Sequence, residues 1–177
     1  MRRFVTIACC LLALTGLALA QSNTGTTSLS VVVAAEAALT VNTATTTLAT
    51  ASTTFANPFT GTTNLTYFVR TSKTSGTGSI TVKISSDFSP AGGPLVATPP
   101  SAGDALTYGC TVSAPGTACT GPITALTTAA TSVATFGTAQ SSAKAGNSAS
   151  LAWSLTDDPA YAAGTYAATA TFTISAS

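Results

Sequence analysis

The sequence contains no histidine, and only 6% of its residues are charged. Histidine is the commonest general base and a frequent metal ligand, so its absence removes two common kinds of site chemistry together. Carboxylates are also sparse, and the adjacent pair Asp157-Asp158 precedes Pro159 in a turn, where such side chains usually accept backbone hydrogen bonds. We therefore expect a protein that is not an enzyme and that has no cofactor. A calcium site would require Asp87 or Asp104 to converge on this pair, because no acidic loop with calcium-binding spacing is present.

Charge is scarce in both signs beyond residue 20. The basic side chains there are Arg70, Lys73, Lys83 and Lys144, and the acidic ones are Glu36, Asp87, Asp104, Asp157 and Asp158. The net charge is therefore about −1, and no basic cluster provides an electrostatic basis for binding nucleic acid. Weak self-repulsion favours association of the protein with copies of itself.

The first 20 residues have the pattern of a secretory signal peptide. Arg2 and Arg3 form a positive start, residues 4–17 form an apolar run, and 18–20 (Ala-Leu-Ala) form a small-x-small cleavage site. The run is short for a bilayer span, so we expect secretion and no membrane span after cleavage. The predicted organisation is a signal peptide at 1–20, a flexible leader at 21–28 and a single β-sandwich domain at 29–177.

Cys110 and Cys119 are the cysteines outside this signal peptide. Two cysteines in an oxidising compartment usually pair, and Pro115-Gly116 between them is a turn signal. We expect a disulfide that closes a hairpin or a loop. Two thiols without a histidine do not suit a metal site.

Short alternating segments separated by turn residues occupy most of the chain. In one of them, Leu151, Trp153 and Leu155 alternate with small residues, which predicts a strand with Trp153 in the core. The expected strands are 29–41, 65–70, 79–85, 105–111, 123–126, 132–136, 148–155 and 165–176. For the first of them, a break near Glu36 or a helical turn at 34–39 is the alternative. This pattern predicts an all-β fold, an antiparallel Ig-like β-sandwich of about 7–9 strands.

The last expected strand has the most regular pattern. Gly164 and Tyr166 lead into a segment in which Ala168, Phe172 and Ile174 share one side while threonines occupy the other. This segment resembles the C-terminal strand of bacterial chaperone–usher fimbrial subunits and of the related spore coat U family. The resemblance implies a secreted bacterial sandwich that lacks one strand, which leaves a groove lined on one side by this segment. The N-terminal extension of the next subunit fills that groove in the family.

The resemblance assigns the role of this extension to residues 28–35, with Leu29, Val31 and Val33 as the inserted side chains. It implies a structural or adhesive protein of the periplasm, the cell surface or the extracellular space, with a second copy or a secretion chaperone as its partner. The alternative is that residues 29–35 complete their own sheet. The protein would then be a self-contained monomer that binds a ligand or wall polymer through loops such as 87–101. Ice binding is a minor alternative, because TATFTIS is the only regular threonine stretch.

Overall fold

The computed structural model describes residues 23–51 and 53–177, so the predicted signal peptide lies outside the described residues. The chain divides into two units, Met1–Val32 and Val33–Ser177. All strands belong to the second unit, and residues 23–35 contain none. Of the first unit, the structure describes residues 23–32, which are in no strand or helix.

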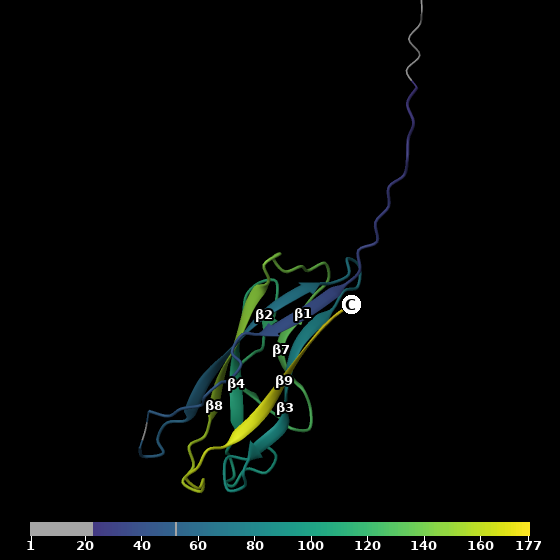
Figure 1. Ribbon diagram of the computed structural model, residues 1–177. Coiled ribbons are helices and arrows are strands. Elements are labelled where there is room, and N and C mark those ends of the chain that lie inside the picture. Colours follow the sequence, from purple (N-terminus) through teal and green to yellow (C-terminus); the bar gives the residue numbers. More distant parts are fainter. Residues whose placement is uncertain (1–22, 52) are drawn as a thin grey trace, which may run out of the picture. The chain divides into compact units, whose positions relative to one another are not determined.

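The second unit is an antiparallel sandwich of two sheets, with no helix among the described residues (Figure 1). One sheet has five strands in the order β1-β2-β8-β4-β6, and the other has four in the order β5-β7-β3-β9. The strands are β1 (Glu36–Val41), β2 (Phe59–Arg70), β3 (Gly78–Ser89), β4 (Leu106–Val112), β5 (Thr117–Ala118), β6 (Ile123–Thr124), β7 (Thr131–Phe136), β8 (Asn147–Leu155) and β9 (Ala167–Ala176). This architecture confirms the predicted Ig-like β-sandwich.

The first predicted strand, 29–41, is wrong in its first half. Only Glu36–Val41 is a strand, and the helical turn considered for 34–39 does not form. The reason lies in the pairing partner, because Glu36 pairs with Arg70, the last residue of β2. The chain turns away after Arg70, so residues before Glu36 have no strand of this sheet beside them.

The core lies between the sheets and is built from alternate residues of the central strands. On β8, Ala149, Leu151, Trp153 and Leu155 are each at most 5% exposed, while the residues between them point outward. The ring of Trp153 meets that of Tyr108 edge-on at a centroid distance of 5.3 Å. Trp153 is therefore part of the core, and period-two alternation on β8 is the cause.

A chain of hydrogen bonds accommodates the polar atom of this tryptophan. Its Nε1 donates to the hydroxyl of Thr63 at 2.8 Å, and the Thr63 hydroxyl lies 2.6 Å from that of Thr46. Thr63 is buried, so its hydroxyl is the partner that offsets desolvation of the indole N–H.

The substitution Thr63→Val keeps the shape of the side chain but leaves the indole N–H without an acceptor. We expect the free energy of unfolding to fall by about 1–3 kcal/mol, as for other unsatisfied buried polar groups. Urea unfolding followed by Trp153 fluorescence measures this loss. Thr62→Val, at the exposed neighbouring position of β2, is the matched control. Equal stability of the two variants would contradict the assigned role.

The predicted disulfide between Cys110 and Cys119 is present, with a Cα–Cα distance of 5.5 Å. Cys110 belongs to β4, and Cys119 directly follows β5, where its N–H donates to the carbonyl of Val133 on β7. The bond therefore closes a loop and not a hairpin, because its two ends belong to different sheets. It links the two sheets on the side of the sandwich where β4 contacts β5. On the opposite side, the edge strands β1 and β9 contact each other.

Replacing both cysteines with serine removes this link between the sheets. The closed loop is short, with a sequence separation of 9, so we expect the free energy of unfolding to fall by about 2–3 kcal/mol. Denaturant unfolding of the double variant, compared with the oxidised parent protein, measures the loss. The reduced parent protein should match the double variant. A midpoint unchanged from the oxidised protein would show that the link contributes nothing to stability.

The open edge at β9

Strand β9 is the last strand of its sheet and pairs only with β3 among the described strands. Its ten residues, AATATFTISA, include no charged side chain and no proline. Proteins usually protect a sheet edge with charges, proline, bulges or very short strands. The other outer strand of this sheet, β5, has two residues and follows the last of these strategies. β9 has neither charge nor proline, and the bulges in its pairing with β3 lie beside its first residues, 167–170. Residues 170–176 pair with β3 in regular register, so this part of β9 presents a regular surface for pairing.

The hydrogen bonds near the end of β9 show which backbone groups face outward. The N–H of Ser177 donates to the carbonyl of Thr77, which lies beside the start of β3. Bonds to one neighbour alternate along an antiparallel strand, so the groups of Phe172 and Ile174 point away from β3. No strand in the described part of the chain pairs with these groups.

The inward face of β9 is incompletely covered. Its apolar side chains pack against the core, yet none is buried; they are Ala168, Ala170, Phe172, Ile174 and Ala176. On the corresponding face of β8, with the same alternation, Ala149, Leu151, Trp153 and Leu155 are all buried. The difference arises from position, because β8 lies between two strands whereas β9 has a neighbour on one side only.

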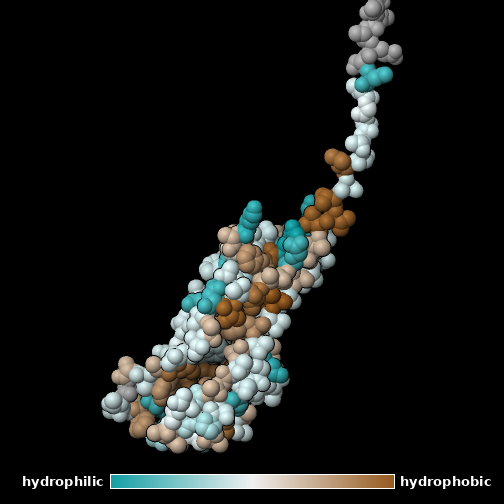
Figure 2. Space-filling view, viewed as in Figure 1, coloured by the Kyte–Doolittle hydropathy of each residue, from teal (hydrophilic) through white to brown (hydrophobic). Residues whose placement is uncertain are grey.

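The edge strand of the facing sheet, β1, lies in contact with β9 and leaves apolar side chains exposed as well. Val41 is 43% exposed, and Leu39 is half-buried against the core. Apolar side chains reach the surface on the face of the sandwich where β1 and β9 lie in front (Figure 2). We call β9 together with Leu39 and Val41 the open edge.

The residues predicted to be inserted side chains are exposed. Leu29 is 93%, Val31 84% and Val33 60% exposed, and none of them is in a strand. Leu29 and Val31 belong to the first unit of the chain, and Val33 begins the second.

Gly164 and Tyr166 lie outside β9, which begins at Ala167. The hydroxyl of Tyr166 donates to the carbonyl of Ala162 at 2.7 Å, and its ring lies against Gly93, where an added Cβ would come within 2.4 Å of the ring. Tyr166 therefore fixes the approach to β9 by packing on a loop. Ala168, Phe172 and Ile174 lie on β9 and line the open edge.

The acidic residues form a separate feature in the loops that follow β8 and precede β4. The hydroxyl of Tyr161 donates to the Asp104 carboxylate at 3.1 Å, and burial together with this carboxylate raises the pKa of Tyr161. Hydrogen bonds from the backbone N–H of Ala160 and then from the side chain of Ser101 lower the pKa of Asp158. No three histidine, cysteine or acidic side chains are placed to hold a metal ion in the part of the chain that the structure describes.

Asp87 stabilises the conformation of the loop 87–101, for which the sequence analysis considered ligand binding. Its carboxylate accepts hydrogen bonds from the backbone N–H groups of Phe88, Val96 and Ala97 at 2.8–2.9 Å. Both carboxylate oxygens are engaged in fixing this loop, as is common for aspartate in turns.

Leu39 and Val41 are the parts of the open edge that the sequence analysis did not assign. Ala170 and Ala176 lie on the same side of the chain as Phe172, so the alternation alone places them on the inward face of β9. The position of Leu39 and Val41 depends on β1 contacting β9 across the two sheets, and no local pattern carries that information.

The chain matches no protein-family model, no curated protein and no solved structure. Within the described residues, no helix has the length and hydropathy needed to cross a membrane.

Proposed function

We propose that this protein is a secreted structural or adhesive subunit that assembles by strand exchange. Residues 28–35 of one copy, which we call the leader from here on, add a strand to the open edge of another copy. Main-chain hydrogen bonds to β9 provide affinity, and alternate apolar side chains provide specificity, as in other cases of strand addition.

The observation that carries this proposal is the unprotected edge of β9. Ten residues without charge or proline present free backbone groups, and the apolar side chains beside those groups are only half-buried. An added strand satisfies both at once, because it pairs with the backbone and covers the exposed apolar surface.

The leader has the complementary pattern. Leu29, Val31 and Val33 lie on one side of an extended chain, at the spacing with which β9 presents its inward side chains. The segment 28–35 carries no charge and is shorter than β9, so it fits along that strand without burying an ionised group.

The start of β1 favours exchange between copies over completion within one copy. Arg70 forms a salt bridge of 2.6 Å with Glu36, and its Nε donates to the carbonyl of Ala34 at 3.1 Å. These contacts hold the chain extended as it enters β1. A leader that folds back on its own sheet needs a reversal immediately before Glu36, where the sequence VVVAAE offers no glycine, proline or asparagine.

Two neighbouring valines of the leader test this proposal. Val31→Asp places a charge on the side that we assign to the open edge, while Val32→Asp places the same charge on the other side. Both positions are highly exposed, at 84% and 94%. We expect Val31→Asp to prevent assembly, measured by light scattering, and Val32→Asp to leave most of it. Equal effects of the two substitutions would show that the leader does not bind as an alternating strand.

A further inference from the structure

All charged side chains of the sandwich except Lys83 lie at its two ends. At the first end of the sandwich, Arg70 of β2 pairs with Glu36 of β1. At the second end, Leu155 of β8 pairs with Leu106 of β4. Arg70, Lys73 and Lys144 lie at the first end. Asp87, Asp104, Asp157 and Asp158 lie at the second, close to the ends of β3 and β8 and the start of β4. We call these the basic end and the acidic end.

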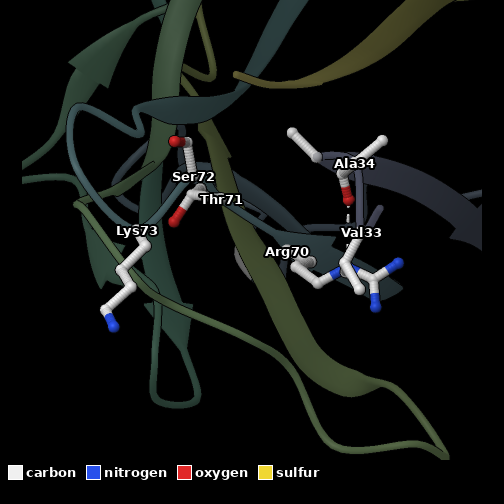
Figure 3. A pocket seen from close by; sticks show the side chains of 7 residues that line it. Val33, Ala34, Arg70, Thr71, Ser72 and Lys73 are labelled. Atoms are coloured by element: carbon white, nitrogen blue, oxygen red, sulfur yellow. Dashed lines mark hydrogen bonds between the residues drawn. The ribbon is translucent and has the colours of Figure 1, made fainter. Parts of the chain in front are cut away.

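At the basic end, two neighbouring pockets of about 440 and 370 Å³ share Arg70 in their walls. Lys73 lines the first pocket and Lys144 the second. Glu36 pairs with Arg70, whereas neither lysine forms a salt bridge to any residue that the structure describes. Figure 3 shows Arg70 beside Ala34 and the Lys73 side chain extending from its loop. Val33, Ala34 and Ala35 also line the first pocket, so the leader joins the sandwich at its basic end.

At the acidic end, hydrogen bonds connect the loops that carry the four carboxylates. Tyr161 bonds to Asp104, and the N–H of Ala162 donates to the carbonyl of Gly92 in the loop after β3. No lysine or arginine pairs with these carboxylates among the described residues. Hydrogen bonds within the loops orient Asp87, Asp104 and Asp158 but leave the charge of these carboxylates uncompensated.

We propose, on the basis of the strand-exchange function, that the basic end of one copy docks on the acidic end of the copy that receives its leader. The charges are complementary, and like ends repel, so only the head-to-tail arrangement is favourable. A contact between two different surfaces of identical subunits produces an open filament. Because the leader joins the basic end, its last residues then lie at the acidic end of the receiving copy.

Charge reversal at the basic end tests this contact. In the chain 21–177, Lys73→Glu with Lys144→Glu should slow association about tenfold or more at low salt, because electrostatic steering turns into repulsion. The difference should disappear in high salt. Lys83→Glu, in the middle of β3, is the control with the same type of substitution and should have a much smaller effect.

A compensating charge reversal at the acidic end is the decisive part of this experiment. Adding Asp157→Lys to the Lys73→Glu/Lys144→Glu protein should raise its association rate at least threefold, since opposite charges again face each other. No recovery, or an equal effect of Lys83→Glu, would overturn the docking inference. The Val31→Asp variant distinguishes the two proposals: if it still prevents assembly while charge reversal has no effect, strand exchange stands and end-to-end docking fails.

Discussion

A chain that starts at Ala35 will remain monomeric at concentrations at which the chain 21–177 assembles. The shortened protein keeps β1 to β9 and the core, so its fold should be intact. It lacks the segment that we assign to the open edge of a neighbour, and no other described segment has this apolar pattern and exposure. Size-exclusion chromatography with light scattering measures the difference in mass.

The shortened chain should also bind a peptide with the sequence of residues 28–35. Burial of Leu29, Val31 and Val33 contributes about 1.5–3 kcal/mol for each side chain, less the cost of ordering the peptide. At a peptide concentration of about 100 times Kd, stabilisation of about 2.7 kcal/mol should raise Tm by roughly 5–10 °C. The same peptide with aspartate in place of Val31 is the control. A shortened chain that assembles like the full chain would contradict strand exchange through the leader.

The second large effect is expected on the receiving side. Ile174→Lys places a charge on the inward face of β9, where the added strand would have to bury it, so assembly should fall at least about 100-fold. Thr173→Lys introduces the same charge on the same strand but on the outward face, and it should leave assembly nearly unchanged. Light scattering over a concentration series of each variant gives the comparison.

Folding of the Ile174→Lys protein must be checked separately, because Ile174 packs against the core. Its side chain is only half-buried, which allows the lysine ammonium group to reach solvent in the unassembled protein. Trp153 fluorescence and far-UV circular dichroism should therefore match those of the parent monomer. A folded Ile174→Lys protein that assembles normally would show that the inward face of β9 is not the receiving surface.

Much of the fold follows from local pattern. Alternation around Trp153 placed β8 and its buried face correctly, and turn residues separated most strands. The disulfide followed from the count of cysteines and the expected compartment. The two-residue strand β5 was not predicted, because so short a segment has no period that can be recognised. The strand expected at 123–126 is present, but only as the two residues of β6.

The long-range features were not accessible from pattern alone. The alternation of β9 is the same as that of β8, yet one strand is central and the other lies at an edge. That distinction depends on the order of strands in the sheet. The start of β1 at Glu36 likewise depends on where β2 ends, and the separation of charge appears only when loops distant in sequence meet at one end of the sandwich.

The disulfide and the open edge have a physical connection. The bond joins the two sheets where β4 contacts β5, while β1 and β9 meet at the edges without a covalent link. The sandwich therefore has a covalent link on the side where its edge strands are shortest, and only non-covalent contacts on the side that we assign to exchange.

Amide hydrogen exchange along β9, measured over a concentration series of the chain 21–177, tests strand exchange most directly. The account predicts that the outward amides of Phe172 and Ile174 exchange rapidly at low concentration and become protected as assemblies form. The amides of Thr171 and Thr173, which face β3, should be protected throughout. Protection of Phe172 and Ile174 in a monomer at every concentration would show that the chain completes its own sheet and would contradict exchange between copies.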